Sequence, residues 1–181
     1  MRLFIGIPLA PEVVEELSRI SNRLRSDADG LRWASPDSWH ITLQFLGETS
    51  GEQYGCIVPR LRALQSPVAP ISLQGLDIFD RAGVFFVGVS VSPELLTLQH
   101  LVSAATDRCG FIPETRPFHP HVTLARAKGD RRGQALRKLM TRVVRETKLG
   151  NFTATEFLLY EAFLGPRGSR YEVRERFRLQ A

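Results

Sequence analysis

The sequence predicts an α+β fold with antiparallel sheets, and three observations support this class. Segments with helical and extended patterns mix along the 181 residues without the regular alternation of a doubly wound parallel sheet. Short glycine-containing turns at residues 80–83 and 165–168 join neighbouring extended segments, as in antiparallel hairpins. The order of strands and helices in the first half recurs in the second, so the chain looks like a loose internal duplication.

Each element expected in the first half rests on a periodic pattern and on residues that end it. Apolar residues alternate with small or polar ones in the extended segments and recur three or four positions apart in the helices. Pro11 opens the first helix, and Pro67 and Pro70 stop the second. In order, we expect a strand at 2–8, a helix carrying Val13, Val14, Leu17, Ile20 and Leu24, extended segments at 31–34 and 39–46 around a turn at 35–37, a helix at 52–64, and a hairpin of 71–79 with 84–91.

The second half repeats this succession and closes with two strands. No low-complexity linker separates the halves, so we expect one domain, residues 1–181, with the junction between halves near 84–93. The expected elements are a helix at 93–108, a strand at 119–126, a helix at 134–146, and strands at 152–164 and 171–179 around the turn at 165–168.

Charge and composition favour an anionic partner. The chain has 24 basic and 19 acidic residues, and 21 of the 24 are arginines, whose planar guanidinium suits phosphate oxygens. Genome base composition or a solvated basic face would explain the same bias, so charge alone leaves both interpretations open. No apolar stretch is long enough for a membrane span and no signal peptide opens the chain, which predicts a cytoplasmic protein without a membrane.

The two cysteines give no sign of a metal site or a disulfide framework. Cys56 and Cys109 lie far apart in the sequence and lack a CxxC or histidine-flanked spacing. We therefore expect both to be buried small apolar residues.

The most informative feature is a repeated tetrapeptide, His40-Ile-Thr-Leu and His121-Val-Thr-Leu, in two expected strands. Because successive side chains of a strand alternate faces, His40 and Thr42 share one face, whereas Ile41, Leu43 and Phe45 share the core face. In the second copy, His121 and Thr123 likewise share a face. Each half therefore presents an imidazole beside a hydroxyl.

Paired imidazoles suit the hydrolysis of a 2',3'-cyclic phosphate. In-line attack needs a base that takes a proton from water and an acid that protonates the departing ribose oxygen opposite. Imidazole serves either role near neutral pH, and the hydroxyls of Thr42 and Thr123 suit the non-bridging phosphate oxygens. One His-x-Thr segment alone would more simply be a solvent-facing strand fragment, but two copies in matching places favour catalysis.

A metal site is the weaker interpretation of the histidines. His119 precedes His121 by two residues and forms a possible ligand pair with it, yet no aspartate or glutamate follows at a ligand-like spacing. We therefore expect no metal and no cofactor, with His119 at the strand entrance as a hydrogen-bonding partner.

At the paired motifs the sequence resembles the 2H phosphoesterase superfamily, specifically the RNA 2',3'-cyclic phosphodiesterases also called 2'-5' RNA ligases. The resemblance extends over nearly the whole chain and includes residues 1–9, Leu31-Arg32-Trp33, residues 45–48, Phe118-His119-Pro120-His121 and residues 168–171. It implies a bilobal fold of pseudo-twofold, duplicated antiparallel sheets, with helices on the outer faces and the motif strands facing each other across a central cleft.

The resemblance also implies roles. It makes His40 the proton donor and His121 the proton acceptor in hydrolysis to a 2'-phosphomonoester, with the roles exchanged in the reverse ligation. Other substrate contacts are weaker expectations. Arg126 would reach the phosphate, although strict alternation puts its side chain on the other face of the strand from His121. Trp33, Phe45 and Tyr171 would stack on a base, although aromatic residues in strands are more often core residues.

Two other functions stay open at this level. A non-catalytic module could use the same basic cleft to hold phosphorylated RNA ends, and a phosphodiesterase could act on a small cyclic nucleotide or a nucleotide sugar. The partner expected in the leading interpretation is RNA with a 2',3'-cyclic phosphate end or a related nucleotide. No obligate protein partner is indicated, and we expect a monomer.

Overall fold

The computed structural model describes residues 1–26, 29–127, 129, 132–143, 149–165 and 168–180. Its helices are α1 (Pro11–Leu24), α2 (Gly51–Arg62), α3 (Pro93–Asp107) and α4 (Arg132–Met140), with a short 3₁₀ turn at Pro36–Ser38. Its strands are β1 (Arg2–Pro8), β2 (Leu31–Trp33), β3 (His40–Glu48), β4 (Ala69–Phe79), β5 (Val84–Val89), β6 (His121–Ala127), β7 (Asn151–Ala154), β8 (Glu156–Gly165) and β9 (Gly168–Arg178).

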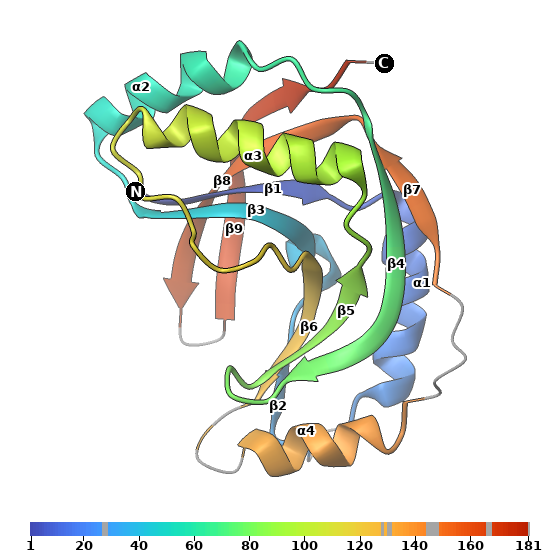
Figure 1. Cartoon of the computed structure of the whole chain (residues 1–181). Helices are drawn as coiled ribbons and strands as arrows, with labels where there is room; N and C mark the ends of the chain where they lie inside the picture. Colours follow the sequence, from blue (N-terminus) through green and yellow to red (C-terminus); the bar gives the residue numbers. More distant parts are fainter. Residues whose placement is uncertain (27–28, 128, 130–131, 144–148, 166–167, 181) are drawn as a thin grey trace.

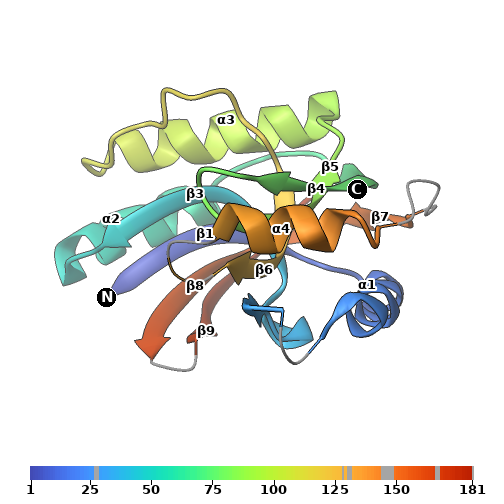
Figure 2. The ribbon, with the colours of Figure 1, turned by 90° about the horizontal axis from the view of Figure 1, so that it is seen from below.

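The strands form two antiparallel sheets, which confirms the expected class. One sheet has the order β3-β1-β8-β9 and the other β2-β6-β5-β4-β7. Helices α2 and α3 lie side by side over the four-stranded sheet, and α1 lies behind β4 in the view of Figure 1. Seen from below, α4 crosses in front of the five-stranded sheet and α1 lies to one side (Figure 2). The bilobal arrangement implied by the resemblance is confirmed.

The helix starts reflect local chemistry. Pro11 occupies the first turn of α1, where its missing N–H costs no hydrogen bond. The Ser50 hydroxyl accepts from the backbone N–H of Gln53, whose side chain accepts in turn from the backbone N–H of Ser50, so a capping box starts α2. Ser92 caps α3 by accepting from the Leu95 backbone N–H.

The core covers the sheet faces that point away from the motif histidines. Ile41 on β3 and Val122 on β6 are fully buried, as are Leu17 of α1 and Leu98 of α3. Alternation along the two motif strands therefore turns their polar residues towards the space between the sheets. No described helix is both long and apolar enough to cross a membrane.

The expected single strand at 152–164 is wrong, because the chain changes sheets within it. β7 pairs with β4 in the five-stranded sheet, whereas β8 pairs with β1 and β9 in the other. Thr155 lies between β7 and β8. The apolar alternation runs through this point with little interruption, so the sequence pattern does not reveal the change of partner.

The strand order also departs from a simple succession of two halves. The four-stranded sheet takes β1 and β3 from the start of the chain and β8 and β9 from its end, while β2 joins the five-stranded sheet. Residues 84–93, where the pattern predicts the junction, contain β5 in the middle of the five-stranded sheet. The helix expected at 134–146 ends at Met140, and residues 144–146 of that prediction lie outside the described residues.

The structure contradicts two expectations for the cysteines, namely that they form no disulfide and that both are buried. Cys56 of α2 and Cys109, just after α3, form a disulfide, with their Cα atoms 5.9 Å apart, and both residues are half-buried. Their separation of 53 residues hides the pairing in the sequence. The side-by-side packing of α2 and α3 brings them together.

Candidate active site

The two motif strands face each other across a cleft between the sheets. β3 is an edge strand of the four-stranded sheet and β6 lies in the five-stranded sheet. His40 and Thr42 line the cleft from one side and His121 and Thr123 from the other, in a cavity of about 1070 Å³. The tertiary structure thus brings together the four residues that the repeated motif singles out.

The two imidazoles are held in the same way. Nδ1 of His40 lies 2.8 Å from the carbonyl oxygen of Ser38, and Nδ1 of His121 lies 2.9 Å from that of His119. A carbonyl oxygen only accepts, so each Nδ1 carries a proton and donates it. This leaves Nε2 of each ring as the atom that can gain or lose a proton, with the ring orientation set by the residue two positions earlier.

Each motif strand continues into a bulge at the same place. On β3 the partners in β1 change between Thr42 and Gln44, and on β6 the partners in β5 change between Thr123 and Ala125. The extra residue shifts the alternation by one position. The fifth residue after each histidine therefore returns to the cleft face, and this is the clearest sign of the pseudo-twofold relation.

The bulges correct two expectations based on strict alternation. Alternation predicts Phe45 in the core, but its side chain is 72% exposed and lines the cleft. Alternation also puts the Arg126 side chain on the other face of β6 from His121. In the structure Arg126 lines the cleft as well, and its charge acts on both motif histidines. Phe45 and Arg126 occupy equivalent positions in the two copies, so one wall carries an exposed ring where the other carries a cation.

The surroundings of His40 disfavour its charged form. Its ring packs at 4.6 Å between centroids against Phe4 and edge-on at 5.2 Å against Tyr171. Burial among these rings lowers the pKa of His40 to about 4, and the positive charges of His121 and Arg126 act in the same direction against the Ser38 hydrogen bond.

His121 is less deeply buried and has its own aromatic contacts. Phe79 and Phe86 meet its ring edge-on at centroid distances of 5.0 and 5.3 Å. Burial lowers the pKa of His121, the hydrogen bond to His119 raises it, and the nearby His119 and Arg126 lower it further. Both imidazoles therefore favour the neutral form in the absence of an anion.

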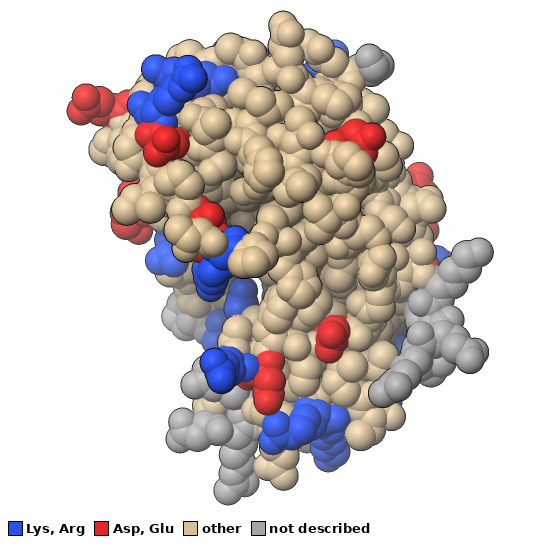
Figure 3. Space-filling model, viewed as in Figure 1, with Lys and Arg blue, Asp and Glu red and all other residues tan. Residues whose placement is uncertain are grey.

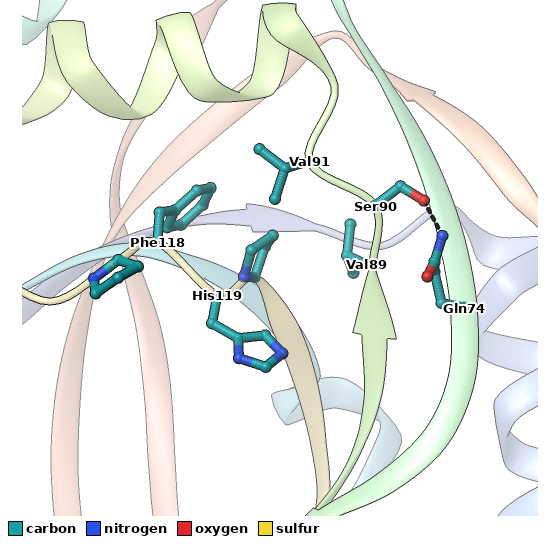
Figure 4. Close-up of a pocket in the computed structure, with 8 residues that line it drawn as sticks. Gln74, Val89, Ser90, Val91, Phe118 and His119 are labelled. Carbon is teal, nitrogen blue, oxygen red and sulfur yellow. Dashed lines mark hydrogen bonds between the residues drawn. The ribbon is translucent and has the colours of Figure 1, made fainter.

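His119 holds His121 through its backbone and borders a second hollow. Its ring meets Phe79 edge-on at a centroid distance of 5.0 Å. A more open cavity of about 620 Å³ adjoins this residue, and Gln74 and Ser90, which are hydrogen-bonded to each other, line its opposite side. Figure 4 shows the Phe118 ring directed towards α3 and the His119 imidazole directed away from it.

Tyr171 and Trp33, the other aromatic residues expected to stack on a base, both line the cleft but already contact other side chains. Tyr171 lines the cleft but packs against His40 and Phe4. Trp33 borders the cleft with its indole already engaged, because Nε1 donates to Asp29 at 2.8 Å and Arg25 covers the ring. Among the described residues, no three or more His, Cys, Asp or Glu side chains lie together as metal ligands would.

Sequence reasoning missed several parts of the cleft. Arg32 lines it, and so does the segment of residues 112–119, in which Ile112 is 89% exposed. A hollow with basic side chains along one side is visible in Figure 3, whereas the face over α3 and β4 carries few charges. The Leu31-Arg32-Trp33 segment can be recognised in the sequence. Whether the Arg32 side chain faces the cleft, however, depends on the strand with which β2 pairs.

Comparison with known proteins identifies the family. A family model described as the 2'-5' RNA ligase superfamily matches residues 8–162. The RNA 2',3'-cyclic phosphodiesterase of Aeropyrum pernix is 33% identical over 165 residues, which cover 89% of this chain and 93% of that protein. The protein of the same name from Archaeoglobus fulgidus is 29% identical over 175 residues, covering 95% and 97%.

A solved structure shows the same relation in three dimensions. Escherichia coli LigT complexed with 3'-AMP has a TM-score of 0.82 to this structure at 26% identity, covering 99% of this chain and 98% of that one. The family match spans most of the residues that carry the two sheets. The chain therefore belongs to the 2'-5' RNA ligase superfamily, the family that its paired histidine motifs resemble.

Proposed function

We propose that this protein hydrolyses the 2',3'-cyclic phosphate at the end of an RNA and leaves a 2'-phosphate. One observation carries the proposal: His40 and His121 face each other across a cleft, each with Nδ1 bound to a backbone carbonyl and Nε2 left for proton transfer. The names of the Aeropyrum and Archaeoglobus relatives support the substrate class.

In the proposed reaction the two histidines act on opposite sides of the phosphorus atom. Nε2 of neutral His121 takes a proton from water while the water oxygen bonds to phosphorus. The bond from phosphorus to the ribose 3' oxygen breaks, and that oxygen takes a proton from Nε2 of protonated His40. The 2' oxygen keeps the phosphate, and each proton transfer lowers the barrier as positioned acid–base catalysis does.

Charge on the phosphate is bound by neighbours of the same strands. Thr42 and Thr123 each lie two residues after a motif histidine, on the same face of the strand. Their hydroxyls donate hydrogen bonds to the non-bridging phosphate oxygens. Arg126 adds a positive charge that favours the five-coordinate state. Phe45 offers its exposed ring to the terminal base, since base stacking on aromatic rings tolerates any base.

Because the pKa of His40 is lowered, His40 takes up the proton that it needs as the acid from solvent only when the substrate is bound. The cyclic phosphate is an anion, and an anion close to an imidazole favours the imidazolium form. Binding therefore raises the pKa of His40, which takes from solvent the proton that it later gives to the leaving oxygen. The near symmetry of the cleft permits the reverse ligation of a 2'-phosphate end, with the two histidines exchanging roles.

Substitution of each motif histidine tests the proposal. On an oligonucleotide ending in a 2',3'-cyclic phosphate, His40→Ala and His121→Ala should each lower kcat roughly 10²–10⁴-fold, whereas His100→Ala, on the exposed side of α3, should leave kcat unchanged. Full turnover by either motif variant would overturn the assignment.

The same assay separates the other functions. A protein that binds the cyclic end without turning it over is a binding module, and one that turns over nucleoside cyclic phosphates but not the oligonucleotide acts on small nucleotides. Identification of a 2'-phosphate product by chromatography tests which oxygen leaves. Turnover that survives EDTA is expected, and its loss would contradict a reaction without a metal.

A further inference from the structure

Two arginines of the cleft lie directly opposite each other on neighbouring strands. In the pairing of β2 with β6, Arg32 is the partner of Arg126, and both residues line the cleft. Like charges directly opposite in a sheet destabilise it. The pair is stabilised if an anion lies between or above the two guanidinium groups.

These two side chains have no carboxylate partner among the described residues. Arg116, by contrast, forms an ion pair with Glu114 at 2.5 Å, also at the cleft. Ion pairs likewise engage Arg62, Arg137, Arg170, Arg174 and Arg176. The positive charge that remains available in the described cleft is therefore concentrated at Arg32 and Arg126.

Arg32 extends this charge away from the motif histidines. Arg126 follows His121 on β6, whereas Arg32 lies on the edge strand β2, about 5 Å further out by the spacing of paired Cα atoms. The Arg32 side chain reaches across the cleft, and its Cδ lies 3.8 Å from the position that a Cβ on Gly168 of β9 would occupy. Elsewhere along the lining of the cleft, Arg116 is paired with Glu114 and Ile112 is apolar.

We propose that Arg32, next to the Arg126 that serves the cyclic phosphate, forms a second phosphate subsite for the phosphate on the 5' oxygen of the terminal nucleotide. In an RNA this group is the phosphodiester to the preceding nucleotide, so the strand leaves the cleft past β2. A guanidinium binds two phosphate oxygens at once through its planar donors. The inference rests on the proposed function, because the cyclic phosphate must lie between His40 and His121.

Three adenosine substrates that differ only at the 5' oxygen test the subsite. They are adenosine 2',3'-cyclic phosphate, its 5'-phosphorylated form, and an adenosine dinucleotide ending in a 2',3'-cyclic phosphate. Arg32→Gln should lower kcat/KM roughly ten- to a hundred-fold for the second and third, the loss of a hydrogen bond to a charged group, and less than about two-fold for the first. Arg60→Gln on α2, an exposed arginine outside the cleft, makes the same charge change as a control.

Salt dependence gives a second readout. The slope of log KM for the dinucleotide against log salt concentration should fall by about 0.7 in Arg32→Gln, as one phosphate contact on a single strand predicts. Arg32→Lys should keep most of the slope while losing part of kcat/KM, because lysine keeps the charge but not the planar fork. Circular dichroism checks that each variant is folded.

The outcomes distinguish the subsite from the proposed function. An equal loss on all three substrates, or no loss on any, would overturn the subsite while leaving the hydrolysis intact. A loss confined to the 5'-monophosphate would overturn its assignment to an RNA strand. If the wild type turns over none of the substrates, the proposed function fails, and calorimetric binding of the dinucleotide 2'-phosphate by wild type and Arg32→Gln still decides the subsite.

Discussion

Gly6 of β1 lies against His40 of β3, so closely that a side chain at residue 6 would meet the motif strand. A Cβ added to Gly6 would lie 3.4 Å from Cδ2 of His40 and 2.9 Å from the carbonyl oxygen of Ile41. The second distance is shorter than packed atoms allow, and the oxygen belongs to the backbone. The position of His40 therefore depends on a glycine in the neighbouring strand.

We expect Gly6→Ala to displace β3 and to lower turnover at least ten-fold, at a cost of about 1–3 kcal/mol in unfolding free energy from overpacking. Gly88 is the matched control, because it pairs with His121 and its added Cβ would meet no atom closer than 3.7 Å. Steady-state kinetics and urea unfolding of both variants check this. Equal activity of the two variants would contradict the role of Gly6.

Acid should destabilise the protein through His40. Its pKa is about 4 in the folded protein and near 6.5 when unfolded, so between these values the unfolded state binds the extra proton. Stability is then complete above about pH 6.5 and falls as the pH drops towards 4, by on the order of 3 kcal/mol. Unfolding free energies measured from pH 7.5 to 4 should show a smaller decline in His40→Asn.

The matched control is His100→Asn on the exposed side of α3, which should behave as the wild type does. A wild-type stability that stays constant between pH 6.5 and 4 would show that His40 is not held neutral.

Each threonine of the motifs can be tested without changing its shape. Thr42→Val and Thr123→Val remove one hydroxyl donor each, and we expect kcat to fall roughly 10²–10³-fold, as with the loss of one transition-state donor. The unfolding free energy should change little, since both residues lie on the cleft face. Equal kcat for wild type and both variants would exclude a phosphate-binding role.

The disulfide should contribute to stability more than to chemistry. Reduction of Cys56–Cys109, or the double substitution to serine, should lower the unfolding free energy by about 2–4 kcal/mol, because the cross-link restricts the unfolded chain. Denaturant unfolding with and without dithiothreitol measures this. The double serine variant is the control and should show no response to dithiothreitol.

The sequence by itself determined the element types and the shared face of each histidine and threonine in the two motifs, because both are local patterns. Helical spacing of apolar residues after Pro11 indicates the buried side of α1. The repeated His-x-Thr segments identify the four cleft residues, because alternation over three positions needs no knowledge of the partner strand. The α+β class rests on the same patterns.

Only the tertiary structure decided which strands meet. The bulges that return Phe45 and Arg126 to the cleft arise from pairing with β1 and β5, and a period of two in one strand carries no trace of its partner's register. The change of sheet at Thr155, the Cys56–Cys109 disulfide and the opposition of Arg32 to Arg126 are likewise contacts between distant segments. Side-chain types are local to the sequence, whereas register and strand partners depend on the packing of the whole chain.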